Sequence, residues 1–276
     1  MAFAVTVVLG GCVATENGRP AGSGAPPGSA AGLPADRADS DTGARTRGSE
    51  ANDETRRRAR IRLELASSHY QQGNFAQALT EIDQAIAVDG RLAAGFGMRA
   101  LIYWQIGDMQ RAESDFRQAL TIEPNDAEVN NNYGWFLCKT NRPKESIQYF
   151  LTASADRLYR TPAMPMHNAG ICSLQAGDEA AAENYFLRAF QIDPANAVAM
   201  YNLGEMYLKR GNIERARFYS DRLLSQYQSN AETLWLGVRV ARRGGDGVYS
   251  NNLAQQLERR FPESRETALL RRGAFQ

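Results

Sequence analysis

The chain has 276 residues, of which 43% are hydrophobic and 23% are charged. This composition is typical of a globular protein and excludes collagen, long coiled coils and polytopic membrane proteins. Lysine and arginine (32) nearly balance aspartate and glutamate (31), which argues against a surface that neutralises nucleic acid phosphates. Two histidines and three cysteines leave little material for a site with several metal ligands, so we expect no metal and no cofactor.

The chain opens with a short apolar run, residues 1–11, that ends in Leu-Gly-Gly and is followed by Cys12. This ending resembles the bacterial lipobox, in which a thiol accepts diacylglycerol and small neighbours let a signal peptidase reach the bond before it. We therefore expect residues 1–11 to be a signal peptide and Cys12 to be lipidated. Since no basic residue precedes Arg19, we expect this signal peptide to be truncated at its start. The alternative is an apolar N-terminus that is frayed or buried as a first helix.

Residues 12–55 are rich in Gly, Pro, Ala, Ser and Asp, and Leu33 is their one leucine. Such a segment buries too little apolar surface to offset the entropy lost on ordering. We expect it to be a disordered linker between the lipidated cysteine and a folded body.

The body of the chain repeats a pattern of 34 residues. A glycine recurs at this spacing, with a small residue five positions later and a large apolar residue four positions after that. The glycine slots hold Gly73, Gly107, Gly177, Gly211 and Gly245, with Asn141 in the remaining slot. The small slots hold Ala78, Ala112, Ser146, Ala182, Ala216 and Ser250, and the large slots include Ile82, Phe116, Phe150 and Phe186.

Each slot has a physical role in a pair of helices. Glycine ends the first helix in the left-handed conformation, and the Asn or Asp that usually follows it caps the second helix. The small residue lets the two helices approach, and the large residue fills the space beside it. In the third unit, Pro143 falls at the first helical position, where proline is tolerated.

A helix–turn–helix of 34 residues with these slots resembles the tetratricopeptide repeat. The resemblance implies an all-α, right-handed superhelix of about six units within residues 56–264, behind the disordered N-terminal tether. The expected units are 59–92, 93–126, 127–160, 163–196, 197–230 and 231–264. Residues 265–276 are expected to form a capping tail, because the end of a solenoid needs a polar outer face. The Gly-rich stretch at 242–247 predicts that the sixth unit is the loosest.

A closer resemblance is carried by residues 130–138, Asn-Asn-Asn-Tyr-Gly-Trp-Phe-Leu-Cys, inside six repeats behind a lipobox. This stretch is similar to the type IV pilus biogenesis and stability lipoproteins of the PilF/PilW type. The resemblance implies an outer-membrane lipoprotein that faces the periplasm and helps the pilus secretin to insert, multimerise or remain stable. Val13, which follows the cysteine in place of Asp, implies outer-membrane sorting by the same resemblance.

Tetratricopeptide arrays bind partners on the concave face lined by their first helices. In this register we expect that groove to carry Tyr70, Leu101, Trp104, Asn131, Trp135, Lys139 and Tyr201. Aromatic residues near a groove make good anchors for a partner segment. The alternative is that both tryptophans belong to the core between repeats. Asn130 and its neighbours would bond a partner backbone, or else only cap the helix start.

Cys138 and Cys172 lie 34 residues apart on the first helices of the third and fourth units. Once Cys12 is acylated, they form an even pair in an oxidising periplasm. We expect a disulfide between them, and the alternative is two small buried thiols.

Residues 56–62 form a cluster of five arginines beside the first repeat. The cluster would meet anionic lipid headgroups or an acidic partner. The alternative, which we favour, is the solvated start of a helix, because Glu54 and Arg58 have the four-residue spacing of a helical ion pair.

Catalysis finds no support in the sequence. His69 and His167 are isolated, and no phosphate-binding loop or catalytic triad motif is evident. We expect a non-enzymatic scaffold that binds secretin or pilus-assembly proteins and no small-molecule substrate. The rival interpretations are another lipoprotein adaptor for envelope assembly and a cytosolic peptide-binding adaptor.

Overall fold

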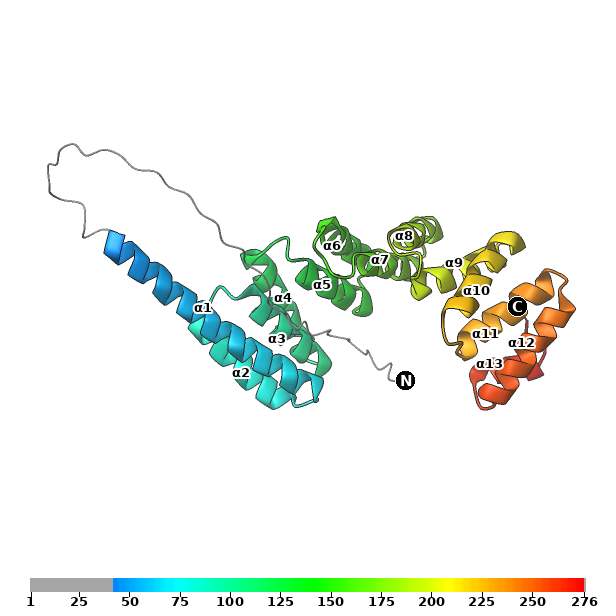
Figure 1. Cartoon of the computed structure of the whole chain (residues 1–276), viewed down its shortest axis with the longest axis horizontal. Coiled ribbons are helices and arrows are strands. Elements are labelled where there is room, and N and C mark those ends of the chain that lie inside the picture. The colour runs from blue at the N-terminus through cyan, green and yellow to red at the C-terminus, as the bar shows by residue number, and fades with distance from the viewer. Residues whose placement is uncertain (1–41, 276) are drawn as a thin grey trace, which may run out of the picture. The chain divides into compact units, whose positions relative to one another are not determined.

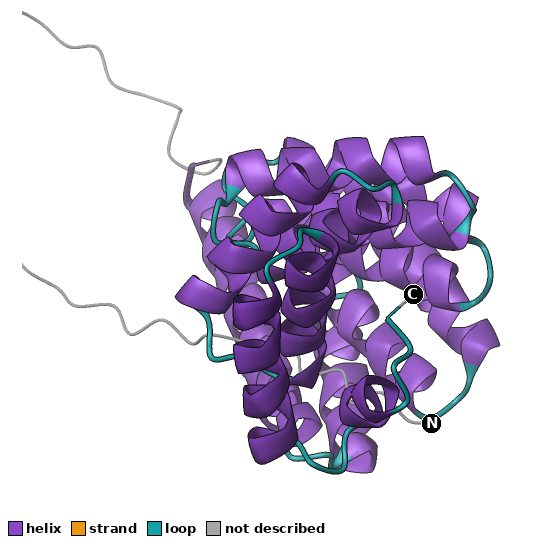
Figure 2. Ribbon diagram, turned by 90° about the vertical axis from the view of Figure 1, so that its right-hand side faces the viewer, coloured by secondary structure: helices purple, strands orange, loops and turns teal. Residues whose placement is uncertain are grey.

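The computed structural model describes the backbone of residues 42–275 and the side chains of residues 53–275, and its regular structure there is entirely helical (Figure 2). The expected signal peptide, Cys12 and the linker up to residue 41 lie outside the described residues. From Gly48 onward the chain forms one compact unit.

Twelve helices of this unit follow one another as antiparallel pairs, and a short thirteenth helix closes the chain (Figure 1). The first helices of the pairs are α1 (Thr42–Gln71), α3 (Ala93–Gln105), α5 (Ala127–Lys139), α7 (Ala163–Gln175), α9 (Ala197–Lys209) and α11 (Ala231–Arg243). The second helices are α2 (Phe75–Val88), α4 (Met109–Ile122), α6 (Pro143–Ala155), α8 (Glu179–Ile192), α10 (Ile213–Gln226) and α12 (Gly247–Arg260), followed by α13 (Arg265–Arg271). This is the tetratricopeptide fold that the repeat pattern predicts.

The turn inside each pair has the backbone geometry expected of its slot. The five glycines have φ between +76° and +88°, and Asn141 adopts φ +65° in the slot that lacks glycine. Asparagine is the residue that best tolerates this region after glycine, since its short polar side chain bonds locally. The next residue caps the second helix through its side chain in four turns, for example where Asp108 accepts from the Arg111 N–H at 3.0 Å. Asn74 and Arg142 occupy the same position without a side-chain cap.

Small residues set the distance between the two helices of a pair. Every small slot of the second helices is buried, and the large slots from Ile82 to Phe186 are fully buried. The approach is closest in the fourth pair, where a Cβ on Gly170 would lie 2.6 Å from Cε1 of Phe186. Gly134 faces Phe150 in the same way at 2.9 Å. Helix contact at this distance leaves no room for a larger side chain.

The first helix is longer than the sequence pattern predicts. We expected residues up to 55 to belong to the linker, but α1 begins at Thr42. Proline is absent between Pro34 and α2, so nothing in this stretch removes a helical hydrogen bond. Glu54 also forms ion pairs with Arg57 (3.3 Å) and Arg58 (2.9 Å) across one helical turn.

The sixth pair is as regular as the others, contrary to our expectation that it is the loosest. Gly245 takes φ +78°, and Asp246 caps α12 by accepting from the Tyr249 N–H at 3.1 Å. The Gly-rich stretch therefore forms the standard turn, and Val238 and its neighbours on α11 are buried. The short α13 and Phe275 pack against this helix, which covers its apolar side at the end of the array.

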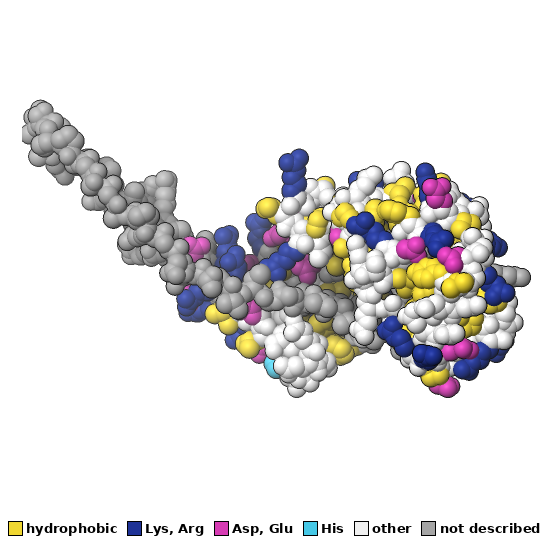
Figure 3. All heavy atoms as spheres, turned by 45° about the vertical axis from the view of Figure 1, so that its right-hand side comes forward, with side chains coloured by type: hydrophobic (Ala, Val, Ile, Leu, Met, Phe, Trp, Pro, Cys, Tyr) yellow, Lys and Arg dark blue, Asp and Glu magenta, His cyan; other side chains and the backbone are white. Residues whose placement is uncertain are grey.

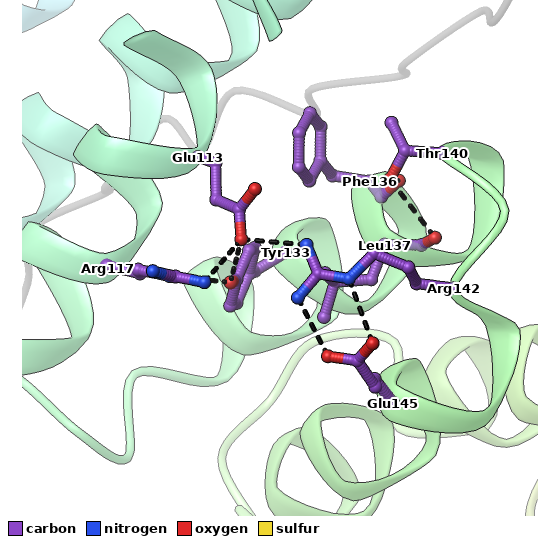
Figure 4. A network of polar contacts seen from close by, with 8 residues as sticks. All are labelled: Glu113, Arg117, Tyr133, Phe136, Leu137, Thr140, Arg142 and Glu145. Carbon is purple, nitrogen blue, oxygen red and sulfur yellow. Dashed lines mark hydrogen bonds and ion pairs between the residues drawn. The ribbon is translucent and has the colours of Figure 1, made fainter. Parts of the chain in front are cut away.

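Two second helices carry a glutamate in the same slot, and each of these glutamates binds side chains of the following pair. Glu113 of α4 accepts from Arg117 (2.6 Å), from Arg142 (2.8 Å) and from the Tyr133 hydroxyl (3.3 Å), and Arg142 also pairs with Glu145 at 2.7 Å (Figure 4). Although burial opposes it, the two guanidinium groups hold the pKa of Glu113 below its usual range.

The corresponding glutamate two pairs later makes the same kind of contact. Glu183 of α8 accepts from the Tyr207 hydroxyl at 2.6 Å and pairs with Arg210. One carboxylate thus fixes an aromatic residue and an arginine of the following pair at two places in the array.

A disulfide joins Cys138 of α5 to Cys172 of α7, with their Cα atoms 5.8 Å apart. Both residues are fully buried, and the amide of Gln175 donates to the carbonyl oxygen of Cys138 at 3.1 Å. The third and fourth pairs are therefore linked covalently as well as by packing.

His167 of α7 is half-buried against the turn that precedes α9. Its Nδ1 lies 3.0 Å from Nδ2 of Asn196, whose Oδ1 accepts from the Ala199 N–H at 2.8 Å. Because the Asn196 oxygen is engaged by the helix, its amide group donates to an unprotonated Nδ1. Burial lowers the pKa of His167 to about 4.

Replacing both Cys138 and Cys172 by alanine should lower the free energy of unfolding by about 3–4 kcal/mol, because the unfolded chain loses a constraint on a long loop. Urea unfolding of the full chain measures the change, and dithiothreitol should destabilise the parent protein but not the variant. Mass spectrometry of the unreduced protein that finds both thiols free would contradict the bond.

Asn141→Ala should lower the free energy of unfolding by about 1–2 kcal/mol, because the Cβ of alanine is crowded in a left-handed backbone and its side chain makes no local hydrogen bond that compensates. The matched variant Asn141→Gly should stay within about 0.5 kcal/mol of the parent, because glycine adopts this conformation freely. Equal stability of the two variants in thermal unfolding would show that the turn does not require positive φ.

The free energy of unfolding should fall as the pH drops from about 6.5 to about 4, because over this range the unfolded chain binds a proton at His167 that the folded chain does not. The loss amounts to at most about 3 kcal/mol. Comparing the parent with His167→Gln over this range isolates the contribution of the His167 ring to stability, since all other titratable groups are present in both proteins. If the free energies of unfolding of the parent and the variant changed with pH in parallel, His167 would not be neutral in the folded protein.

Candidate partner-binding surface

The residues that we predicted to line the groove all lie on first helices, namely α1, α3, α5 and α9. Their surroundings differ, and the structure brings only some of them together.

Trp135 and Lys139 form one element of this surface. They lie one turn apart on α5, with Nζ of Lys139 4.3 Å from the centre of the Trp135 ring. Trp135 is half-buried, and its inner side packs against the cluster that contains the Cys138–Cys172 disulfide. The lysine is exposed. The accessible edge of the Trp135 ring and the Lys139 cation therefore lie together, and the disulfide that links two repeats supports them from the inner side.

Trp104 lies on α3, the first helix of the preceding pair. Its ring meets Phe136 of α5 edge to face, with the ring centres 5.5 Å apart. Both Trp104 and Leu101 are half-buried and pack against the core shared by the second and third pairs. Each tryptophan is thus half-buried, with part of its ring in the core between repeats and part accessible.

The asparagines of α5 are engaged inside the protein. Asn131 is buried; its Oδ1 accepts from Nδ2 of Asn168 at 3.0 Å, and its own Nδ2 lies 3.6 Å from the sulfur of Met164. Asn130 donates to the carbonyl oxygens of Pro124 (2.9 Å) and Asp126 (2.8 Å). Asn130 thus has the local role at the helix start that we had weighed against partner binding.

The two tyrosines of the predicted set stand apart from the tryptophans. Tyr70 packs on Phe75 within the first pair, with ring centres 5.8 Å apart, and burial raises its pKa. Tyr201 lies on α9, where burial and the carboxylates of Glu205 and Glu232 raise its pKa above the usual range.

A second cluster near Tyr201 was not predicted as a site. Arg239 of α11 forms an ion pair with Glu205 of α9, and its guanidinium lies 5.6 Å from the Trp235 ring centre. Trp235 in turn contacts Phe275, whose ring carries Arg242 at 3.8 Å. Arg239 is only 9% exposed. The 34-residue register would have identified this cluster, since it relates Tyr201 to Trp235 and Glu205 to Arg239.

Two hollows at the surface of the described residues lie elsewhere. One of about 840 Å³ is bounded by α1 and the α2–α3 turn, and one of about 340 Å³ lies beside Tyr149 and Asn130. Residues 53–275 contain no group of three or more His, Cys, Asp or Glu side chains placed to hold a metal ion. Of the helices between residues 42 and 275, none is both long enough and apolar enough to cross a bilayer. On the face drawn in Figure 3, acidic and basic side chains are interspersed among hydrophobic ones.

Comparisons with known proteins agree with this architecture. Models of the tetratricopeptide repeat match residues 63–127, 116–148 and 173–235. The chain is 29% identical over 204 residues to the type IV pilus assembly protein PilF of Pseudomonas aeruginosa, covering 74% of this chain and 81% of that protein.

Solved structures give the same relationship. The crystal structure of PilW, described as a widely conserved type IV pilus biogenesis factor, is 34% identical with a TM-score of 0.67, and the match covers 77% of this chain and 97% of PilW. The structure of Pseudomonas aeruginosa PilF is 28% identical with a TM-score of 0.71, covering 80% of this chain and 98% of that one. The chain therefore belongs to the tetratricopeptide-repeat proteins and, among them, to the type IV pilus biogenesis family that includes PilW and PilF.

Proposed function

We propose that this protein is an outer-membrane lipoprotein that binds the type IV pilus secretin and assists its localisation, multimerisation or stability. The observation that carries the proposal is the similarity to PilW over nearly the whole length of that protein. The fold supports it as well, because stacked helical repeats form extended surfaces that bind other proteins.

The surface proposed for the partner comprises Leu101, Trp104, Trp135 and Lys139 on α3 and α5. Half-buried aromatic rings lose little conformational entropy on binding and offer large apolar area, so they suit the anchor positions of an interface. Trp104 and Trp135 are held from behind by Phe136 and by the disulfide cluster, respectively. This preorganisation lowers the cost of ordering the site when a partner arrives.

The lipid anchor makes a second contribution to the binding of the partner. We propose that Cys12, in the Leu-Gly-Gly-Cys sequence, carries the lipid and that residues 13–41 connect it to the repeats on the periplasmic face of the outer membrane. Holding the repeats near the bilayer raises their effective concentration toward a partner that assembles in the same membrane.

The double variant Trp104→Ala/Trp135→Ala should capture at least about tenfold less secretin from detergent-solubilised membranes, since truncation of aromatic anchors typically costs 2 kcal/mol or more. Phe218→Ala is the matched control, because this ring is 51% exposed but lies on a second helix, α10. Circular dichroism checks that both variants keep the fold.

Equal capture by the parent and the tryptophan variant would exclude this surface as the binding site. Normal secretin multimers and normal piliation after deletion of the gene would refute the pilus role itself. Capture of a different envelope complex in place of the secretin would favour the rival adaptor function.

A further inference from the structure

The segment that follows α13 turns back onto α11. Gly273 adopts φ +67°, and its N–H donates to the carbonyl oxygen of Leu270 at 3.0 Å. The Ala274 N–H donates to the carbonyl oxygen of Leu269, also at 3.0 Å. These two bonds form a Schellman motif, which ends a helix and fixes the direction of the chain after it. The motif places Phe275 against α11.

Phe275 contacts two side chains of α11. Its ring centre is 5.5 Å from that of Trp235, with the ring planes tilted by 32°, and the guanidinium carbon of Arg242 lies 3.8 Å from the Phe275 ring centre. Trp235 is buried, Phe275 is half-buried and Arg242 is exposed. An indole ring and a guanidinium group both attract the π-system of a further ring, so together they form a site for an aromatic side chain.

Trp235 is held in place by its neighbours. The guanidinium of Arg239 lies 5.6 Å from the Trp235 ring centre and is ion-paired with Glu205 of α9. Leu253 and Leu257 of α12 belong to the same buried cluster as Trp235. Packing from α9 and α12 therefore preorganises the indole, so a ring that binds here does not have to order it.

The repeat register relates this site to the surface that we propose for the partner. Arg239 falls in the slot of Leu101 and Trp135, and Arg242 falls in the slot of Trp104. Equivalent slots of a solenoid lie on equivalent faces of its helices. Phe275 therefore covers, on α11, the face that α3 and α5 present at the proposed partner surface.

The contact between residues 273–275 and α11 depends on the Phe275 ring. Within the described chain, the three backbone N–H groups of this segment donate to residues 269, 270 and 273, and none of them donates to α11. A competing ring can replace Phe275 without breaking a hydrogen bond between the segment and α11.

We propose that the site formed by Trp235 and Arg242 binds an aromatic side chain of an extended partner segment, and that Phe275 is an internal ligand which this side chain displaces. The chemistry of the occupant follows from the ring that the site already holds, which contacts indole and guanidinium together. The inference goes beyond secretin binding, and none of its steps requires the partner to be the secretin.

Two other roles for Phe275 fit less well. A ring that only caps the array needs apolar cover, which Leu269 and Leu270 of α13 also supply to this cluster, and it has no need of a cation. Exchange of the ring with a second copy of the chain is opposed by the turn at Gly273, which directs each Phe275 onto its own α11.

The test uses the full chain with Trp104→Phe/Trp135→Phe, in which Trp235 is the one remaining tryptophan. The probe is the peptide acetyl-Gly-Ala-Phe-Ala-Gly-amide, and the NMR signal of the Trp235 indole N–H follows its binding. Adding Phe275→Ala should tighten binding at least about tenfold, because a site that its own ring fills for about nine-tenths of the time offers only the remainder to a ligand. The peptide with Leu in place of Phe should bind more weakly.

Gly273→Pro should tighten binding in the same way, since the fixed φ of proline is incompatible with +67° and misdirects a ring that is still present. Phe218→Ala is its control, because it removes a ring of α10 that is 51% exposed, and it should leave the affinity unchanged. With Phe275→Ala, Arg242→Gln should weaken binding about two- to fivefold, as expected for an exposed cation–π contact.

Arg259→Gln, at an exposed arginine of α12, is the control for the loss of charge and should have no effect. Circular dichroism checks the fold of every variant.

Equal affinity of the Phe peptide for the chains with and without Phe275 would overturn the proposed displacement. Equal affinity for the Phe and Leu peptides, or no binding of either at millimolar concentration, would leave Phe275 as a cap. A dimer that Phe275→Ala dissociates would assign the ring to a second copy instead. Because no secretin is present, failure of this test leaves the proposed pilus function intact.

Discussion

Close contact between a small residue on the first helix and a large apolar residue on the second sets the geometry of the helical pairs. In the third and fourth pairs Gly134 and Gly170 lie against Phe150 and Phe186, so near that a Cβ would overlap the ring. Since protein interiors are packed as densely as organic crystals, this contact determines how the two helices cross and where the outer side chains of the first helix point. The accessible sides of Trp104 and Trp135 follow from that placement.

Contacts between pairs then turn separate units into one array. Glu113 and Glu183 each hold an aromatic hydroxyl and an arginine of the next pair, and the buried disulfide joins the third pair to the fourth. A surface ion pair contributes little alone, but a carboxylate shared by several donors and partly shielded from water contributes more. The disulfide lies in the same cluster as Trp135, so the strongest link in the array supports the proposed partner site directly.

The two ends of the array have different surfaces. At the C-terminal end α13 and Phe275 cover the apolar side of α11, and Arg239 is buried in an ion pair with Glu205. At the N-terminal end α1 leaves Ile61 and Leu65 half exposed beside arginines.

The repeat fold could be predicted from the sequence because each slot of the 34-residue pattern has a local physical cause. A left-handed turn at Asn141, a proline at the start of α6 and buried alanines facing large apolar residues are all requirements within one helical pair, and a sequence register reveals them. Residues 42–55 were assigned to the linker because Gly and Ser are frequent in linkers, although α1 begins at Thr42. The Gly-rich stretch of the sixth unit was expected to loosen it, although Gly245 is required for the turn itself.

Which polar side chains remain available was decided only by the tertiary structure. Asn131 has a groove position in the register, yet its amide is bonded to Asn168 from the next pair; Arg239 resembles a surface charge, yet it is buried in an ion pair with Glu205. Such contacts join residues more than 30 positions apart, and their existence depends on how one pair is rotated on the next. By itself, therefore, the sequence determined the helical pairs and their order, because those follow from local sterics and periodicity. The tertiary structure decided which side chains face a partner, because that depends on packing between pairs.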